Sequence, residues 1–321
     1  MSLTFSEAEA LFARMLDGGM ADDEIRDTLL TLAERGETAQ EIAGAAKAMR
    51  DRMSRISAPD HAIDVCGTGG DGQHSLNIST ATALVVAACG VPVAKHGNRA
   101  ASSKAGTADT LEALGLNLDN AGTRAEQTLA EIGIAFLFAQ THHPAMRYVM
   151  PIRKALGRRT IFNLIGPIAN PAGVTRQLIG IASPAYVEIY RDAMKLLGMD
   201  KVMIVAGLEG LDELSIAGPS KVATIGIPGI ATEVAPEDAG LPRHPLSAIR
   251  GGEADFNAAA LARLLNGEHG AYRDAVLFNS AAALLVAGEA HDWREGVEET
   301  AEAIDKGLAK ALLDCWVAAC R

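Results

Sequence analysis

The sequence predicts an α/β protein with a small all-helical N-terminal domain and a larger α/β domain, in which helices flank a mainly parallel sheet. Two patterns support this. The first 53 residues combine helix-capping motifs with amphipathic spacing. From about residue 63 onward, short apolar runs alternate with helical segments, which is typical of parallel strands joined by helices. A chain of 321 residues is also long enough for two unequal domains.

The N-terminal part is expected to contain short helices. Ser6 with Glu9 and Thr38 with Glu41 each fit the S/T-x-x-E capping box, in which side chains bond free amides of the first turn. The segment between them, 22–35, places its apolar residues mainly on one helical face: Ile25, Leu29, Leu30 and Leu32.

The α/β part begins with a strand over 63–66 that runs into a glycine loop and then into a helix opened around 77–80. Further strands are expected at 91–97, 134–139, 176–183, 201–207 and 221–227. Further helices are expected at 80–89, 104–115 and 274–288.

The segment 142–171 interrupts this alternation with helical stretches and four prolines. We expect it to pack back onto the N-terminal helices, so that the small domain is discontinuous in sequence. The expected helical domain then comprises 1–62 and about 142–176, and the expected α/β domain comprises 63–141 and about 177–321.

Charge and composition exclude several classes of function. A net charge of -11 should repel nucleic acid and anionic membranes. No apolar run approaches the roughly 18 residues needed to span a bilayer, and the N-terminus lacks the basic end of a signal peptide, so we expect a cytoplasmic protein. The cysteines show no CxxC spacing, which favours reduced thiols over zinc at Cys66, Cys89, Cys315 and Cys320.

The loop CGTGGDG, residues 66–72, is the first candidate binding element. Its glycines permit positive φ and let backbone N–H groups approach an anion; they are Gly67, Gly69, Gly70 and Gly72. Polar groups that can bind phosphate or share a metal follow at a helix start: Asn77, Ser79 and Thr80. A tight turn with an ordinary cap explains the glycines alone equally well. The spacing matches neither GxGxxG nor GxxxxGK[ST], which argues against a dinucleotide fold and a P-loop NTPase.

A basic segment supplies the second candidate. Residues 95–159 contain nine lysines and arginines and five acids, a net charge of +4 within an acidic chain. Any one of these charges would usually be a solvated surface residue, but cations beside glycine and serines favour a polyphosphate site. The group at its start, KHGNRAASSK, contains Lys95, His96, Asn98, Arg99, Ser102, Ser103 and Lys104.

Two further features are weaker when taken alone. Asp212 and Glu213 follow the expected strand 201–207, and adjacent carboxylates commonly bind magnesium when the substrate supplies phosphate oxygens, although such pairs also occur on plain surfaces. Arg153 lies in an amphipathic segment that could aim its guanidinium at a carboxylate; a surface arginine at a helix end is the alternative.

Together these segments resemble the anthranilate phosphoribosyltransferase family over nearly the whole chain. The motifs follow the family's order and spacing: GTGGDG, NIST, KHGN, SSKAGTAD, HHPAMR, RTIFNLIGP, NP, GLDE, GGEADFN and NSAAALLVAG. The resemblance implies transfer of a phosphoribosyl group from 5-phosphoribosyl 1-diphosphate to anthranilate in tryptophan biosynthesis. It also implies Mg2+ as cofactor and a homodimer formed through the helical domain.

The resemblance assigns residues to three sites. The donor would contact Gly67, Gly70, Asp71, Asn77, Ser79, Thr80, Lys95 and Thr107. Magnesium would be held by Ser79, Asp212 and Glu213. Anthranilate would meet Asn98, His96, His143, Arg153 and the Gly166-Pro167 turn, and the expected catalytic residues are Arg153, Asn98 and His96.

The departures from the family pattern are few. Thr107 stands where the family often has serine, and Cys66 stands where an aliphatic residue is more common. Ala100 and Ala101 replace part of a stretch that usually contains serine or valine. None of these differences removes a charged or metal-binding group, and threonine keeps the hydroxyl.

Two other functions remain open at this stage. A pyrimidine nucleoside phosphorylase would share the fold and the loops, but that family usually carries an extra C-terminal domain and lacks the HHPAMR and RTIFNLIGP motifs. A non-catalytic relative that binds nucleic acid would have a strongly basic surface and could dispense with Asp212 and Glu213, whereas this chain is acidic and keeps both.

Overall fold

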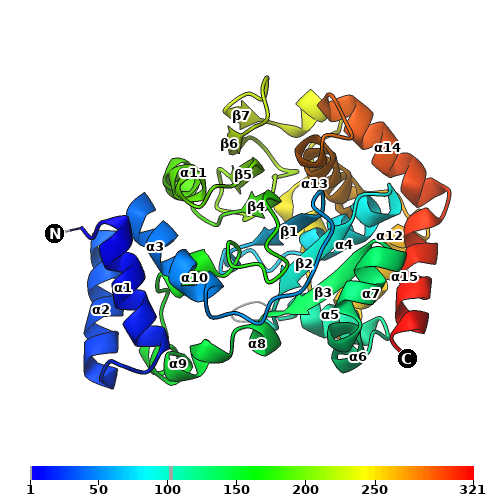
Figure 1. Ribbon diagram of the computed structural model, residues 1–321. Helices are drawn as coiled ribbons and strands as arrows, with labels where there is room; N and C mark the ends of the chain where they lie inside the picture. Colours follow the sequence, from blue (N-terminus) through cyan, green and yellow to red (C-terminus); the bar gives the residue numbers. More distant parts are fainter. Residues whose placement is uncertain (1, 101–103) are drawn as a thin grey trace.

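The larger part of the molecule is built on one sheet. In the residues that the computed structural model describes, 2–100 and 104–321, seven strands lie in the order β3-β2-β1-β4-β5-β6-β7 (Figure 1). The pairs from β3 to β5 are parallel, and β6 and β7 add an antiparallel edge. Because the chain leaves β1 on one side toward β2 and returns on the other side with β4, the carboxyl ends of β1 and β4 form a topological switch point, where ligands bind in open α/β sheets.

The predicted strands are confirmed, with shifted ends. Their bounds are β1 Ile63–Gly67, β2 Val93–Gly97, β3 Ile134–Phe138, β4 Arg176–Gly180, β5 Lys201–Gly207, β6 Ser220–Ile225 and β7 Glu233–Val234. The second strand begins at Val93 rather than at residue 91, because Pro92 lacks the N–H group that a ladder requires.

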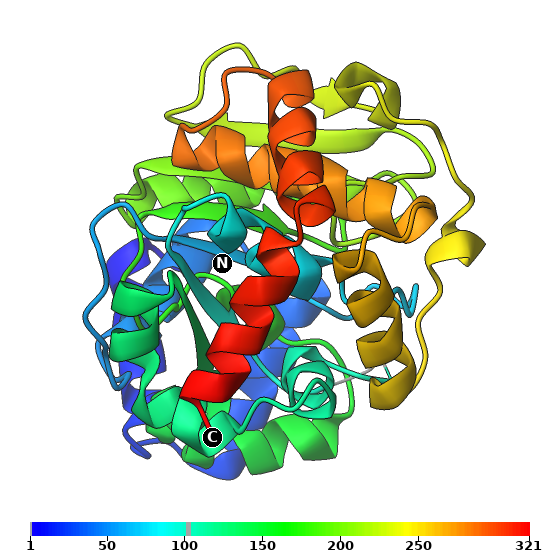
Figure 2. The ribbon, with the colours of Figure 1, turned by 90° about the vertical axis from the view of Figure 1, so that its right-hand side faces the viewer.

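Two buried helices form the centre of the α/β part. These helices are α4, Ile78–Ala88, and α13, Ala271–Ala287; they pack on each other and on the sheet. Nearly every side chain of α13 is buried, as its alanine-rich sequence predicts. Figure 2 shows α14, Trp293–Asp305, and α15, Leu308–Ala319, on the outside of this layer.

Shorter helices complete the α/β part. The α-helices are α5 Thr107–Ala113, α6 Leu118–Thr123, α7 Ala125–Glu131, α8 Ala139–His142, α11 Val187–Leu196 and α12 Ala254–Leu265. The 3-10 helices of this part are η2 Pro184–Tyr186, η3 Pro236–Ala239 and η4 Leu246–Ile249, whereas η1 Pro144–Tyr148 lies in the segment 142–171. Helix α5 begins at Thr107 rather than at residue 104, because Gly106 has an extended backbone.

The helical part lies at the left of Figure 1. Its N-terminal helices are α1 Phe5–Leu16, α2 Asp22–Arg35 and α3 Ala39–Arg50. Helix α9, Met150–Leu156, packs on α2, and α10, Phe162–Ile165, packs on α3. The segment 142–171 therefore returns to the N-terminal helices, while the exact domain boundaries stay a prediction.

One of the two predicted capping boxes is confirmed and the other is wrong. Thr38 and Glu41 cap α3 as expected. Helix α1 is capped by Thr4 with Glu7, rather than by Ser6 with Glu9. A capping residue needs a non-helical backbone, and Thr4 has one, with φ -69° and ψ 166°, whereas Ser6 already lies inside the helix.

The contact between α1 and α3 depends on Gly44. A Cβ at this position would lie 2.5 Å from the Phe5 carbonyl oxygen and 2.7 Å from the Ala8 Cβ. We expect Gly44→Ala to push the helices apart and lower the free energy of unfolding by about 1–3 kcal/mol, as measured by denaturant titration. Gly122→Ala in α6 is the control, because apart from the chain neighbours and the backbone of its own helix no described atom lies within 4 Å of that Cβ position. Equal stability of Gly44→Ala, Gly122→Ala and the unchanged protein would contradict the close helix contact.

Candidate active site

The glycine loop follows β1 directly at the switch point. Gly69, Gly70 and Gly72 have φ of 66°, 75° and 72°, a region that other residues rarely adopt. Gly67 is required for a different reason, since a Cβ there would overlap the carboxylate of Asp212. The glycines therefore shape the loop and also make room for an acidic residue from the loop after β5.

Asp212 and Glu213 lie over the ends of β1 and β4. The Gly69 N–H donates a hydrogen bond to Asp212 Oδ2 at 2.7 Å. Gly180, the last residue of β4, has no room for a Cβ because the Asp212 carbonyl oxygen occupies that space. The structure thus brings the glycine loop and the acidic pair together, as expected, and adds Gly180, which the sequence analysis did not single out.

The acidic pair carries more negative charge than its surroundings neutralise. Burial and the Asp71 carboxylate raise the pKa of Asp212 to about 7. Burial and the charge of Asp212 raise the pKa of Glu213 well above its usual range, although Lys95 opposes this. Within the described residues, Asp71 Oδ2 is also buried without a hydrogen-bond partner. These groups fit a bound divalent cation, which would remove the repulsion among them.

Any cation held here needs further ligands. In the described ranges, no three His, Cys, Asp or Glu side chains converge at one point. Two carboxylates would therefore be completed by a hydroxyl group, water and substrate oxygens, which is the usual coordination of magnesium. Ser79 can supply the hydroxyl. Its backbone hydrogen-bonds the Glu213 carboxylate, which places Ser79 next to the acidic pair.

Lys95 lies in the interior, on β2. Its Nζ donates to the Val65 carbonyl oxygen at 2.6 Å and to Ser79 Oγ at 3.3 Å. Burial lowers the pKa of Lys95, while the charge of Asp64 acts in the opposite direction. Lys95 and Ser79 therefore stand side by side at the start of α4, within the electrostatic reach of the acidic pair.

The remaining residues predicted to contact the phosphoribosyl donor surround the start of α4. Thr80 Oγ1 donates to Thr107 Oγ1 at 3.3 Å, which brings these two predicted residues together. Asn77 is already engaged, because its Oδ1 accepts from Thr110 at 2.6 Å and from Asn257 at 2.9 Å. The Asn77 side chain thus ties the helix start to α5 and α12, and local spacing in the sequence does not reveal these two partners.

The basic group around residue 99 does not form the expected cluster. Arg99 is exposed and pairs with Asp109 at 2.8 Å and Glu112 at 2.5 Å. Lys104 is exposed and lies 3.8 Å from Glu253. Both charges are thereby paired with carboxylates away from buried Lys95, and the polyphosphate site favoured by this segment stays a prediction. Ala101, Ser102 and Ser103 lie outside the described residues.

Two histidines contact each other, His96 from β2 and His143 from the junction of α8 and η1. His96 Nε2 and His143 Nε2 are 3.2 Å apart, so one ring donates a hydrogen bond to the other. Burial, with His143 and His142 nearby, lowers the pKa of His96 to about 3. Burial and His142 lower the pKa of His143 to about 4. Both rings are therefore neutral at physiological pH.

Arg153 and Asn98 are the other predicted acceptor residues. Arg153 Nη2 donates to Asn163 Oδ1 at 3.4 Å, and its guanidinium lies 5.3 Å from the centre of the Phe162 ring. Burial lowers the pKa of Arg153, which has no carboxylate partner in the described part of the chain. Asn98 is exposed just after β2, and its Oδ1 accepts from the Arg99 N–H and from Gln140.

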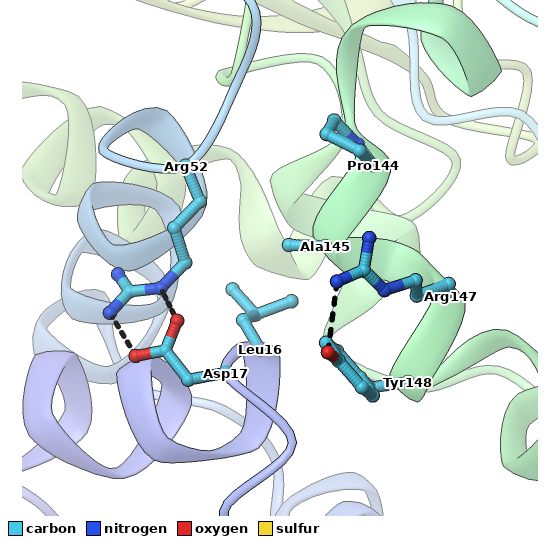
Figure 3. Close-up of a pocket in the computed structure, with 7 residues that line it drawn as sticks. All are labelled: Leu16, Asp17, Arg52, Pro144, Ala145, Arg147 and Tyr148. Carbon is cyan, nitrogen blue, oxygen red and sulfur yellow. Dashed lines mark hydrogen bonds and ion pairs between the residues drawn. The ribbon is translucent and has the colours of Figure 1, made fainter.

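The hollow in Figure 3 is separate from these groups. It has a volume of about 220 Å³ and lies between α1, the end of α3, and η1. Arg52 and Asp17 form an ion pair at 2.6 Å on one side, and Arg147 donates to Tyr148 on the other. None of the predicted site residues lines it.

Family models match both parts of the chain. Residues 1–53 match the helical bundle domain of a glycosyl transferase family, and residues 59–310 match its a/b domain. An anthranilate phosphoribosyltransferase from Novosphingobium aromaticivorans is 67% identical over 315 residues, covering 98% of this chain and 96% of that protein. The enzyme of that name from Sphingopyxis alaskensis is 63% identical over 317 residues, with the same coverage of both.

Solved structures show the same similarity. The crystal structure of anthranilate phosphoribosyltransferase from Thermus thermophilus has a TM-score of 0.95 and 42% identity, covering 100% of this chain and 97% of that one. The enzyme from Saccharomyces cerevisiae in complex with PRPP and Mg has a TM-score of 0.89 and 27% identity, covering 99% and 93%.

The raised pKa of Asp212 can be tested without any ligand. The folded-state pKa of about 7 exceeds the ordinary 3.8, so the charge of Asp212 destabilises the folded state progressively as the pH rises through this window. We expect Asp212→Asn, with chelator present, to melt at a higher temperature than the unchanged protein at about pH 8 and at nearly the same temperature at about pH 4. If Asp212→Asn instead melted at a lower temperature than the unchanged protein at about pH 8, the ionised Asp212 carboxylate would not be destabilising the folded state.

Proposed function

The chain belongs to the anthranilate phosphoribosyltransferases, and from that premise we propose how its residues carry out the reaction. The enzyme transfers the phosphoribosyl group of 5-phosphoribosyl 1-diphosphate to the amine of anthranilate, releasing diphosphate, in tryptophan biosynthesis. The observation that carries the proposal is the hydrogen bond from Gly69 N–H to Asp212, which joins the glycine loop to the acidic pair at the sheet's switch point. The nucleoside phosphorylase and nucleic-acid-binding alternatives gain no support from these relatives.

The donor lies with its diphosphate over the loop 67–72. Gly67 and Gly70 give the backbone access to phosphate oxygens, and Lys95 supplies positive charge next to Ser79. Thr80 and Thr107 offer a linked pair of hydroxyls. Asn77 acts mainly by fixing the start of α4, and Asp71 faces the metal side of the loop.

Ser79, Asp212 and Glu213 hold magnesium in this proposal. When bound, the ion supplies positive charge to the departing diphosphate. Support comes from the uncompensated charge of the buried carboxylates and from the yeast relative, whose structure is in complex with PRPP and Mg. The carboxylates also exclude other anions from this position until a cation is present.

The chemical step depends on the leaving group. The lone pair of an aniline nitrogen is delocalised into its ring, so the amine is a poor nucleophile. We therefore expect the bond from the anomeric carbon to diphosphate to be largely broken as the bond to nitrogen forms, with inversion at that carbon. The amine proton is lost to solvent. Loop amides and Lys95 stabilise the charge that develops on diphosphate.

The acceptor side works by orientation. Arg153 binds the anthranilate carboxylate with its planar fork, and Phe162 and Asn163 hold that fork in place. Asn98 and the neutral His96 and His143 contribute hydrogen bonds, and the Gly166-Pro167 turn closes the site beside His96. Because both histidines are neutral, they do not place a second cation near the donor.

The homodimer forms through the helical part in this proposal. Tyr148 on η1 and Met150 on α9 have exposed apolar side chains, and Tyr148 lines the hollow of Figure 3. A second copy would cover them.

Helices long and apolar enough to cross a membrane are absent from the described residues. The cytoplasmic location stays a prediction.

Replacing Arg153 tests the acceptor site. Arg153→Ala should raise the anthranilate KM by about tenfold to a hundredfold, because a charge-assisted pair to the carboxylate is lost, while the donor KM changes by less than about threefold. Both constants follow from the loss of anthranilate fluorescence. Lys154→Ala, the exposed neighbour, is the control and should leave both constants unchanged. An equal rise in both KM values for Arg153→Ala would refute its assigned role.

A further inference from the structure

The segment 164–168, which contains the Gly166-Pro167 turn, is held through its carbonyl groups. Tyr190 of α11 donates to the Leu164 oxygen, and Gln177 of β4 donates to the Pro167 oxygen at 2.7 Å. Arg50, the last residue of α3, donates from Nε to the Ile168 oxygen at 2.6 Å. Three side chains from three different elements thus fix this short segment.

Arg50 differs from the other two because it is charged and comes from the N-terminal helices. Its Nη2 contacts Met199 Sδ at 3.4 Å, and no ion pair to a carboxylate joins it within the described part of the chain. Burial, together with Arg55, lowers the pKa of Arg50 to about 10, so the guanidinium is still charged at neutral pH. A partly buried cation whose strongest contact is one carbonyl makes a charge-assisted hydrogen bond, which is stronger than a neutral one.

The held segment leads directly to the acceptor residues. The Gly166 backbone hydrogen-bonds the His96 imidazole, and His96 in turn contacts His143. At its other end, the segment begins in α10, where Phe162 and Asn163 contact Arg153. Figure 1 shows α3 beside α10, so a displacement of the α3 end would be transmitted to this turn.

The donor side is anchored separately. The glycine loop is tied to Asp212, and Lys95 is tied to Val65 and Ser79. None of these bonds involves Arg50 or the Ile168 carbonyl. A change at Arg50 should therefore affect the acceptor half of the site much more than the donor half.

We infer that Arg50 is a positioning residue for the acceptor: through the Ile168 carbonyl, the end of α3 sets the Gly166-Pro167 turn against which the aromatic amine binds. The inference rests on the proposed acceptor site. It gives the N-terminal helices a role in substrate binding by the same chain, in addition to their packing role.

The test compares Arg50→Met, which keeps much of the side-chain length but has no donor, with the unchanged enzyme. We expect the anthranilate KM to rise about three- to tenfold, the scale of one lost hydrogen bond, and the donor KM to stay within about twofold. Lys47→Met is the matched control, since it removes an exposed cation from the same helix and should change neither constant. Arg50→Lys, which keeps the charge and one donor, should recover part of the loss.

The outcomes separate the two proposals. An unchanged anthranilate KM in Arg50→Met, or an equal rise in both KM values, would overturn the role of Arg50 even if the melting temperature falls. If Arg153→Ala still raised the anthranilate KM, the acceptor site would stand without Arg50. Unchanged anthranilate KM values in both variants would overturn the acceptor site itself. If Arg50→Met does not fold, the same criteria apply to Arg50→Lys, for which a smaller selective rise is expected.

Discussion

The close approach of the acidic pair to the ends of β1 and β4 is the constraint on which the site depends. Gly67 and Gly180 are the strand ends over which Asp212 lies, and neither position has room for a Cβ. The Gly69 N–H then holds the Asp212 carboxylate at 2.7 Å. Burial of Asp212 beside Asp71 raises the pKa of Asp212 to about 7, so its negative charge costs stability in the protein alone. In the proposed function, a divalent cation would balance these carboxylates, and phosphate oxygens of the substrate would complete the ligands of that cation.

This arrangement explains how an acidic chain can bind a substrate with several negative charges. The surface arginine and lysine after β2 are paired with carboxylates, so they do not provide a shared cationic patch. Instead, the glycine loop offers backbone N–H groups, and Lys95 offers one buried charge. In the proposed function, recognition of the phosphoribosyl donor depends on the carboxyl ends of the strands and on the metal. Arg153 and the histidine pair would recognise anthranilate through hydrogen bonds and a single guanidinium.

Local patterns predicted most of the fold, and they pointed to the residues of the proposed site. The glycine loop, the start of α4 and the acidic pair were recognisable because each follows an apolar strand, and parallel strands bring their carboxyl ends together. The sequence could not show the partners of these groups. Gly180, Asn257 and Arg50 act on residues far away in the chain, so no local spacing reveals them. The capping error has a local cause, because Thr4 rather than Ser6 has the extended backbone that a cap needs.

The most direct test of the metal and diphosphate site is a magnesium titration of the loss of anthranilate fluorescence in the presence of 5-phosphoribosyl 1-diphosphate. The experiment compares the unchanged protein with Asp212→Asn and with the control Asp200→Asn. Asp200 is an exposed carboxylate directly before β5. If the buried pair binds magnesium, chelation stops the fluorescence decay, and Asp212→Asn alone needs at least about tenfold more magnesium for half of the maximal rate. A decay that persists in chelator, or the same magnesium midpoint in all three proteins, would contradict the assignment of the acidic pair.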